Sequence, residues 1–247
     1  MIPYDIEGLM KKGAYEELIS RKMVPENSVS DKIICYIKEH HVNTSEVADC
    51  LNKTGAVRGA VPLTRGLFCC GRVHYIYAFS DSNWPVHEQI AAMPEGAIVY
   101  VDAIGIAERA IFGELVTRFL IEKKKAPAIV TGGLLRDAEE LRTMKAPVWC
   151  RGFTPEGCFN RKEIITAEAE AAVSRGRDLY DNAVAVCDDC GAVLIPRNCV
   201  NEEMLEKLVF MEERERTWFH CVMDLDWNTY DTVCMKKYKE TGQTEIA

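Results

Sequence analysis

The feature that most limits how this chain can fold is the alternation of short apolar runs with helical segments between residues 94 and 150. Continuous apolar runs of this kind are typical of strands buried on both faces of a parallel sheet. The runs are residues 97–101, 127–130 and 147–150. The segments between them, 114–124 and 138–144, carry apolar residues at helical spacing. Strands that alternate with helices predict an α/β fold.

The segments on either side extend this α/β pattern. Helical spacing of apolar residues predicts helices over 6–19, 30–37, 44–51, 167–175 and 202–220. Aromatic and β-branched residues predict strands over 67–77, 183–186 and 192–195, the last two joined by the turn signature at 188–191. We therefore predict an N-terminal helical arm at 1–40, one α/β domain at 41–220 and an irregular, polar tail at 221–247.

Charge and composition exclude several classes of protein. The net charge of −8 disfavours a binder of duplex nucleic acid, whose affinity comes mainly from neutralising phosphates. The sequence contains no uninterrupted apolar run of ~18 residues, the length of a membrane span. Residues 1–7 lack the basic and apolar regions of a secretory signal. We therefore interpret the eleven scattered cysteines as reduced thiols and expect a cytoplasmic protein.

Two segments contain residues that suit a ligand. In segment 105–116, glycine is followed by a helical pattern, and the free backbone N–H groups of a helix N-terminus bind carboxylate or phosphate oxygens. In segment 132–137, two glycines and then Arg136 and Asp137 follow a buried strand, where ligands of open α/β sheets collect. Arg136 could hold a carboxylate and Asp137 could hold Mg²⁺. The alternative is a surface ion pair, or a helix cap by Asp137.

Taken together, five short segments in this order resemble the RraA-like family. They are residues 97–102, 113–116, 133–137, 147–152 and 188–196. The resemblance covers roughly residues 40 to 220. The family groups the regulator of ribonuclease activity A with 4-hydroxy-4-methyl-2-oxoglutarate/4-carboxy-4-hydroxy-2-oxoadipate aldolases, and some members were formerly labelled demethylmenaquinone methyltransferases.

The resemblance implies a layered α/β/β sandwich that assembles as a homo-trimer or homo-hexamer. It also implies that backbone amides of the turn hold the carboxylate of pyruvate, and the matching residues are Gly113, Glu114, Leu115 and Val116. Arg136 then binds the pyruvyl oxygens, Asp137 anchors Mg²⁺ (or Mn²⁺), and Glu114 lies near the water shell of the metal. A glutamate from the C-terminal helix of a neighbouring subunit completes the site, and the candidates are Glu212, Glu213 and Glu215.

The function implied is that of a metal-dependent lyase that cleaves a 4-hydroxy-2-oxo acid or an oxaloacetate-like keto acid through a pyruvate enolate. A cation where the enolate oxygen develops negative charge fits this chemistry. Two alternatives remain open. The chain could be a regulator that binds a protein partner such as a ribonuclease, because fold does not fix function.

The second alternative is a lyase for a different sugar acid or keto acid. The glycine-rich stretch expected before the turn at 188–191 is replaced by the charged segment 161–181, and Gly132 stands where the family usually has an acidic residue or asparagine. Arg151, Arg161 and Lys162 are candidates to contact a second carboxylate, although a solvated surface is the simpler explanation for all three. These differences concern the substrate more than the residues around the enolate.

Overall fold

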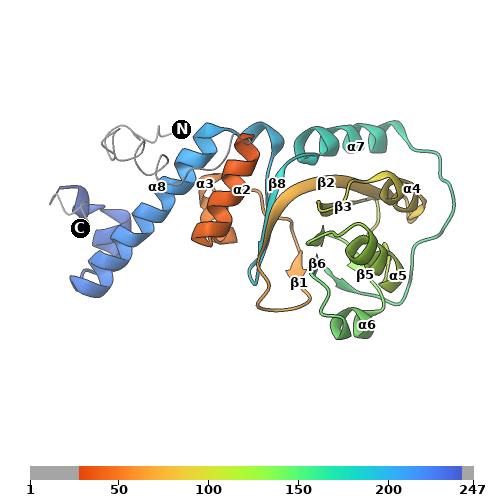
Figure 1. Ribbon diagram of the computed structural model, residues 1–247, viewed down its shortest axis with the longest axis horizontal. Helices are drawn as coiled ribbons and strands as arrows, with labels where there is room; N and C mark the ends of the chain where they lie inside the picture. The colour runs from red at the N-terminus through yellow and green to blue at the C-terminus, as the bar shows by residue number, and fades with distance from the viewer. Residues whose placement is uncertain (1–27, 241–247) are drawn as a thin grey trace. The chain divides into compact units, whose positions relative to one another are not determined.

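The computed structural model describes residues 28–240 (Figure 1). Residues 29–208 form one compact unit, and the chain from Val209 onward belongs to a second. No helix between residues 28 and 240 is both long enough and apolar enough to cross a membrane. The helix predicted over 6–19 lies outside the described residues, and the predicted division into arm, domain and tail stays a prediction.

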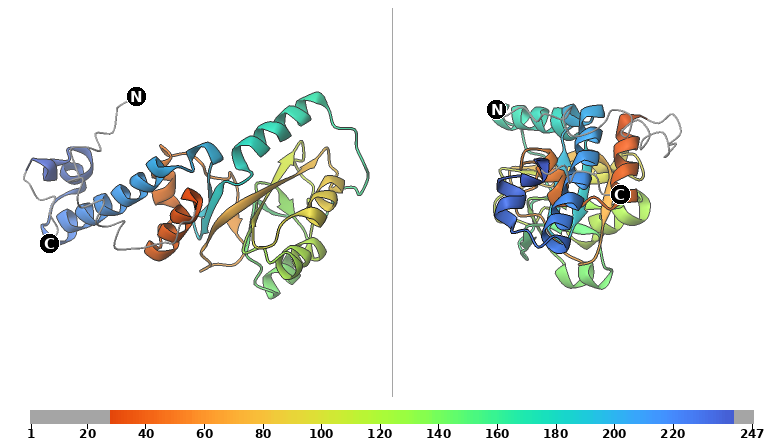
Figure 2. Two further views of the ribbon diagram at one scale, coloured as in Figure 1. Left: turned by 45° about the horizontal axis from the view of Figure 1, so that its top comes forward. Right: turned by 90° about the vertical axis from the view of Figure 1, so that its left-hand side faces the viewer.

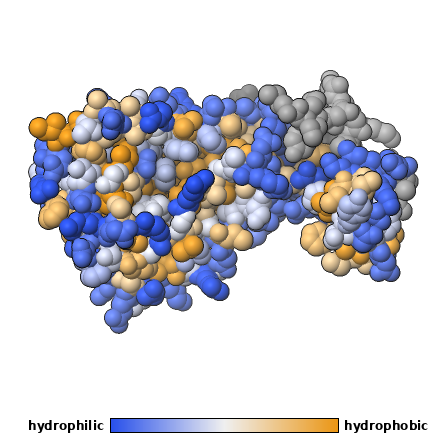
Figure 3. All heavy atoms as spheres, turned by 180° about the vertical axis from the view of Figure 1, so that it is seen from behind, coloured by the Kyte–Doolittle hydropathy of each residue, from blue (hydrophilic) through white to orange (hydrophobic). Residues whose placement is uncertain are grey.

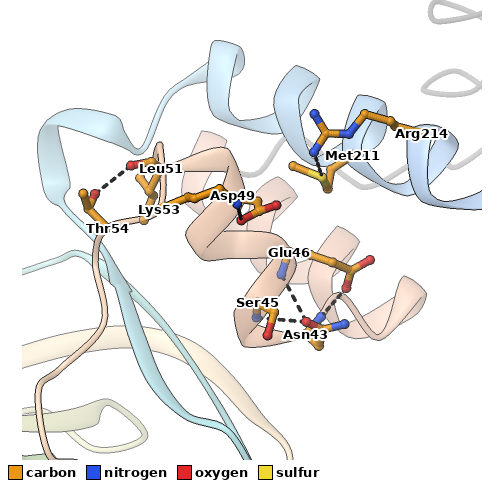
Figure 4. A network of polar contacts seen from close by, with 9 residues as sticks. All are labelled: Asn43, Ser45, Glu46, Asp49, Leu51, Lys53, Thr54, Met211 and Arg214. Atoms are coloured by element: carbon orange, nitrogen blue, oxygen red, sulfur yellow. Dashed lines mark hydrogen bonds and ion pairs between the residues drawn. The ribbon is translucent and has the colours of Figure 1, made fainter. Parts of the chain in front are cut away.

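Two helices open the first unit, as predicted. They are α2 (Val29–His40) and α3 (Thr44–Cys50). The side chain of Asn43 accepts hydrogen bonds from the backbone N–H groups of Ser45 and Glu46, at 2.9 and 3.1 Å (Figure 4). The Glu46 carboxylate accepts in return from the Asn43 N–H at 2.7 Å. This reciprocal capping box explains why a helix of only seven residues begins sharply at Thr44.

A mixed sheet of seven strands forms the centre of this unit, in the order β1-β6-β4-β3-β2-β8-β9. The strands are β1 (Val61–Pro62), β2 (Cys69–Phe79), β3 (Ile98–Ile104), β4 (Ile129–Thr131), β6 (Val148–Cys150), β8 (Val184–Asp188) and β9 (Gly191–Ile195). β2, β3, β4 and β6 are parallel neighbours, whereas β1, β8 and β9 pair antiparallel. A separate parallel pair joins β5 (Leu134–Leu135) to β7 (Gly152–Phe153). The sequence predicted the six strands of three or more residues, but not the two-residue strands β1, β5 and β7.

Strand β2 connects two parts of the sheet. Its first residues, from Cys69 to Arg72, pair with β8, and the rest, from Val73 to Phe79, pair with β3. The β8–β9 hairpin thereby folds over one face of the parallel strands. The Trp149 indole of β6 donates a hydrogen bond to the Asp188 carbonyl at 2.7 Å. The two β layers are thus tied together, as the expected α/β/β arrangement requires.

The two faces of the parallel strands have separate cores. On one face, buried residues such as Val101, Ile129 and Leu141 pack with helices. These helices are α4 (Trp84–Ala92), α5 (Glu114–Arg118) and α6 (Ala138–Thr143). On the other face, Ile98 and Trp149 pack with residues of the β8–β9 hairpin. The side chains on the two faces alternate along each strand, which is why the strands read as continuous apolar runs.

Three helical predictions need correction. The segment 114–124 is not one α-helix, because α5 passes into a π-helix over Phe119–Lys123. Helix α4 was not predicted, although Pro85 follows its first residue and proline is favoured there. Helix α7 (Ala167–Tyr180) is longer than predicted and packs against β2 and β3 (Figures 1 and 2). On the face seen in Figure 3, hydrophobic residues lie scattered among hydrophilic ones.

The chain after β9 is more regular than predicted. Helix α8 (Glu202–Phe219) confirms the predicted C-terminal helix. The tail was expected to be irregular, and this is wrong: π-helices cover His220–Asp224 and Tyr230–Cys234, and a 3₁₀ turn covers Lys237–Lys239. Within the second unit, Arg214 lies over the Trp218 ring at 4.6 Å and donates to the Met211 sulfur (Figure 4). The Trp218 indole donates to the Tyr238 hydroxyl at 3.4 Å.

Candidate functional site

The structure brings most of the predicted site residues together in one pocket of about 140 Å³. Of the predicted set, Gly113, Leu115, Val116, Arg136 and Asp137 line it. They come from two segments separated by about twenty residues of chain, the start of α5 and the loop after β5. The remaining wall comes from α4 and from residues 157–160. The two glycine-containing segments therefore lie together in the structure, and their role as a ligand site stays a prediction.

The first element of the site is the turn into α5. The helix begins at Glu114 and not after Gly105, so the free N–H groups lie eight residues later than the glycine that first suggested them. The Glu114 N–H donates to Asp137 Oδ2 at 2.9 Å. A Cβ on Gly113 would collide with the same carboxylate and with the stem of Arg136. Glycine is required at this position because the Arg-Asp loop approaches the backbone so closely.

Asp137 has an unusual backbone conformation. It precedes α6 with φ 58° and ψ 46°, the left-handed region, which costs a non-glycine residue of order 1 kcal/mol or more. Both predicted alternatives fit the structure, because the carboxylate lies 3.8 Å from Arg136 Nε and accepts from the first N–H of α5. The side chain does not cap α6, the helix that it precedes. Instead the carboxylate points to the turn at Glu114, and a third of the side chain remains exposed (38%). The strain is thus associated with aiming this carboxylate into the pocket.

Arg136 is positioned by glycine as well. The Arg136 N–H donates to the Phe112 carbonyl at 3.1 Å, which ties the loop to the strand–helix turn. A Cβ on Gly157 would come within 2.7 Å of Arg136 Nη1, so the guanidinium rests on bare backbone there. Arg136 Nε lies 3.8 Å from Asp137 Oδ2. Half of the Arg136 side chain is exposed (52%), which leaves its other nitrogens free to meet a ligand.

Glu114 differs from the expected arrangement. Its Oε1 accepts a hydrogen bond from Arg118 Nε at 2.7 Å, one helical turn further along α5. The Glu114 side chain is therefore directed along the helix, and it does not line the pocket. Leu115 is the most exposed of the turn residues (81%), whereas Val116 is buried.

Residues that the sequence did not point to complete the pocket. Asn83 is 8% exposed, its Nδ2 donates to the Ile111 carbonyl at 3.0 Å, and its Oδ1 has no hydrogen-bond partner among the described residues. An unpartnered buried acceptor is costly and calls for a donor in the pocket. His87 of the same helix lines the pocket too. Proline at the start of α4 was the signal that could have located this helix.

The loop 156–161 forms the opposite wall. Its backbone is held by bonds between Ala110 and residues 156 and 158, at 2.7 and 2.9 Å. Burial raises the pKa of the Cys158 thiol to about 11, so this cysteine stays protonated at neutral pH. Arg109 and Arg161 lie over the Phe159 ring at 4.7 and 4.5 Å, beside this wall. Arg151 and Lys162, the other candidates for a second carboxylate, do not line the pocket.

The donor set suits a hard divalent cation. Asp137 Oδ2 is engaged by Glu114 N–H, while Oδ1 makes no hydrogen bond to a described residue. Mg²⁺ typically takes one or two carboxylates and keeps several water ligands. A partly exposed carboxylate with a free oxygen suits this coordination. No group of three or more histidine, cysteine or acidic side chains suited to a metal exists among residues 28–240. A cation here would therefore be held mainly by Asp137, water and ligand oxygens.

The glutamates proposed to act across a subunit interface belong to the second unit. All three lie on α8. Glu212 Oε1 accepts from Arg216 at 2.9 Å. Burial raises the pKa of Glu213, which Arg216 partly opposes. Their role in a neighbouring copy stays a prediction.

The strand–helix turn and the Arg-Asp loop meet beside a mixed sheet, so the chain is an α/β protein with a pocket lined by Arg136 and Asp137. The comparison with protein-family models makes this class more specific. The model of the RraA-like family, described as Aldolase/RraA, matches residues 44–194. The chain belongs to this family. The match spans both segments of the pocket and most of the sheet.

The chain is also similar to individual proteins. The chain is 23% identical over 210 residues to protein DlpA of Legionella pneumophila; the match covers 81% of this chain but only 32% of that protein. The chain thus spans about a third of the length of this relative. Among solved structures, an uncharacterized protein from Pseudomonas syringae has a TM-score of 0.63 at 18% identity, over 87% of this chain and 98% of that one.

A second solved structure is Streptomyces coelicolor RraAS2, described as an unusual member of the RNase ES inhibitor RraA protein family. Its TM-score is 0.58 at 20% identity, over 75% of this chain and 96% of that one. At such identities the likeness concerns the fold. The family name itself covers aldolases as well as RraA proteins, so the family alone does not choose between them.

Proposed function

We propose that this protein is a divalent-metal-dependent lyase that cleaves a 4-hydroxy-2-oxo acid or an oxaloacetate-like keto acid and releases pyruvate. The observation that carries the proposal is the meeting of the α5 turn, Arg136 and Asp137 in one pocket. The α5 turn offers N–H groups to the substrate carboxylate, and Arg136 offers a positive charge to the enolate oxygen. Asp137 offers a hard oxygen ligand to a metal ion.

The turn at the start of α5 would bind the substrate carboxylate. The N–H groups of Leu115 and Val116 lie in the first turn and have no acceptor within the helix. Both residues line the pocket. The Glu114 N–H is already bonded to Asp137, so it would orient the Asp137 carboxylate and not the substrate.

Arg136 would stabilise the charge that develops during cleavage. When the bond between C3 and C4 of the substrate breaks, its electron pair forms the C2–C3 double bond, and the π electrons of the C2 keto group move onto its oxygen as an enolate. The guanidinium rests against Gly157, and the backbone N–H of Arg136 ties its loop to the Phe112 carbonyl, so the charge would meet the enolate with little reorganisation. Asp137 would hold the metal, which when bound supplies a Lewis acid for the keto oxygen.

Asn83 and His87 would act on the hydroxyl end of the substrate. The buried Asn83 Oδ1 needs a donor, and the 4-hydroxyl of a hydroxy-oxo acid is one. Accepting that hydrogen bond orients the hydroxyl whose proton leaves when the bond breaks. His87 lines the same pocket, and its ring nitrogens can donate or accept a hydrogen bond there. We further propose that the protein works as a homo-trimer or homo-hexamer, with a glutamate of α8 completing the site of a neighbouring copy.

The test is an assay of pyruvate release coupled to lactate dehydrogenase. The substrates are oxaloacetate and 4-carboxy-4-hydroxy-2-oxoadipate, with Mg²⁺ or with EDTA. The variants are Arg136→Ala and the matched control Arg175→Ala, an exposed arginine of α7 away from the pocket. Pyruvate release that requires both Mg²⁺ and Arg136, and that survives Arg175→Ala, supports the proposal.

Other outcomes separate the alternatives. Binding of Mn²⁺, measured by calorimetry and lost in Asp137→Asn, without turnover of either compound would indicate a different sugar acid or keto acid as substrate. Neither turnover nor metal binding would contradict the lyase. It would favour a non-catalytic regulator with a protein partner such as a ribonuclease. The Streptomyces protein is described as a member of a family of RNase ES inhibitors.

A further inference from the structure

A second pocket, of about 330 Å³, lies between the parallel strands and the β8–β9 hairpin. Its walls come from the loop 55–58, from β3, from Gly132 after β4, from Tyr180 of α7 and from Leu194 of β9. It therefore opens at the carboxyl ends of β3 and β4, where ligands of open α/β sheets collect. Its volume falls within the range of pockets that hold small molecules, roughly 300–1,000 Å³. It shares no lining residue with the pocket of Arg136 and Asp137.

Asp102 is the one acidic residue in this wall. It is partly buried in β3, and its Oδ2 accepts a hydrogen bond from the Tyr75 hydroxyl at 3.1 Å. Among residues 28–240 no lysine, arginine or histidine forms an ion pair with it. Burial raises the pKa of this carboxyl, and only the Tyr75 hydroxyl and a backbone N–H oppose that shift. A carboxylate withdrawn from water without a counter-ion is unfavourable unless a cationic ligand supplies one.

Tyrosine rings lie next to this carboxylate. Tyr100, two residues before Asp102 and on the same face of β3, contacts Tyr180 edge-on at 5.2 Å between ring centres, and both line the pocket. Tyr75 joins them at 5.9 Å from Tyr100. No lysine or arginine lies over any of these three rings within the described chain. A carboxylate beside aromatic rings that line the same pocket, as Tyr100 and Tyr180 do, is a combination that recognises organic cations in proteins.

Two further residues of the wall bear on a ligand: Gly132 leaves space in the pocket, and Arg58 contributes a charge. Gly132 faces the Arg58 carbonyl, and a side chain there would come within 3.2 Å of it. Arg58 is exposed on the rim and carries the only positive charge in the wall. It forms no ion pair with Asp102, so its charge does not replace a ligand at the carboxylate.

We propose that this pocket is a second ligand site, which binds a small molecule through a primary ammonium group. Asp102 is the counter-ion, and the rings of Tyr100 and Tyr180 contact the cation and the carbon atoms next to it. The proposal does not rest on the lyase function, because none of its residues lines the Arg136 pocket.

The experiment titrates n-butylammonium into the full chain, followed by ligand-observed NMR and calorimetry. The comparison ligands are n-butanol, which has the same carbon chain without charge, and n-butyrate, which has the opposite charge. Asp102→Asn removes the counter-ion while its amide oxygen still accepts from Tyr75. The matched variant Arg58→Ala removes the other charged side chain of the same wall. Tyr100→Leu removes a ring and provides a second test should Asp102→Asn unfold, which circular dichroism reports.

We expect saturable binding of n-butylammonium in the millimolar range and weak or no binding of the other two ligands. Asp102→Asn should weaken the affinity about tenfold or more, the usual effect of losing a charged hydrogen-bond partner. Tyr100→Leu should weaken it several-fold, and Arg58→Ala should leave it equal or tighter because a like charge is gone. The absence of saturable binding, equal binding to folded Asp102→Asn, or preferred binding of n-butyrate that depends on Arg58 would each overturn the proposal. Pyruvate release by Asp102→Asn is a separate readout and tests the lyase alone.

Discussion

The two pockets of the 29–208 unit are built in opposite ways. The pocket of Arg136 and Asp137 is made of loops and helix starts on the helical side of the sheet, and backbone N–H groups and glycines position its charged groups. The pocket of Asp102 lies on the side of the hairpin, and its carboxylate and tyrosine side chains come from β3 and α7, with the loop 55–58 and Gly132 closing the wall. In the first, two short motifs carry the charges. In the second, alternation along β3 places an acidic residue between tyrosines. The comparison shows that a site made of short motifs is recognised in a sequence more easily than a site made of side chains that share one face of a strand.

The largest expected effect separates the two pockets by function. Arg136→Ala should lower kcat/KM for pyruvate release by on the order of 3 kcal/mol, a hundredfold or more, because an oriented cation at the enolate oxygen is lost. The binding of n-butylammonium should not change. Steady-state kinetics and the titration described above measure both. A variant with full turnover would mean that Arg136 does not meet the developing charge.

The next prediction tests whether the first pocket requires a residue without a side chain at position 113. Gly113→Ala should destabilise the protein by about 1–3 kcal/mol, because its new methyl group displaces the Asp137 carboxylate. Turnover should fall with it. The control is Gly71→Ala in β2, where a Cβ would meet only Ile98, at an ordinary 3.4 Å, and where less than about 1 kcal/mol is expected. Urea unfolding measures the free energy of unfolding of both variants. Equal values would contradict the close approach of the Arg-Asp loop to Gly113.

A smaller effect should leave both pockets intact. Asn43→Ala removes the cap of α3 and should cost about 1 kcal/mol, since two backbone N–H groups lose their acceptor. Ser45→Ala, on the exposed side of the same turn, is the control and should cost little. Thermal unfolding measures the difference, and pyruvate release at low temperature should be the same in both. A loss of turnover confined to Asn43→Ala would show that α3 supports the site.

The smallest effect concerns the pH dependence of stability in the second pocket. Because the pKa of Asp102 is raised in the folded protein, the folded state holds this proton more tightly than the unfolded chain. The stability linked to that proton is present at low pH and is lost as the pH rises from the ordinary aspartate range through the raised pKa. Burial also raises the pKa of Tyr75 and Tyr100, so the phenols stay protonated throughout.

Asp102→Asn should therefore gain stability relative to the unchanged protein as the pH rises through that interval. The nearby charged side chains, Arg58 and Arg177, are present in both proteins, so their contribution cancels in the comparison. Urea unfolding at a series of pH values measures the difference. If the difference in unfolding free energy between the two proteins does not change with pH, Asp102 ionises as easily in the folded protein as in water.

The regular elements were largely predictable because they depend on local periodicity. Strands buried on both faces read as apolar runs, which is how β3, β4 and β6 were found. The helix α4 was missed because only Val86 and Ile90 of its nine residues are buried, too few for a clear helical stripe. The two-residue strands β5 and β7 exist only because they pair with each other, and no local pattern marks them.

The chain sequence by itself determined the α/β class, the start of a helix near Glu114 and the arrangement of glycine, arginine and aspartate that marks the first pocket. The tertiary structure alone decided that Asp137 bonds to the Glu114 N–H, that Glu114 turns to Arg118, and that Asn83 and Gly157 complete the wall. It also placed Asp102 under Tyr180. The physical reason is range: hydrogen bonding and side-chain periodicity within an element are local, whereas a pocket is formed by contacts between residues far apart in the chain.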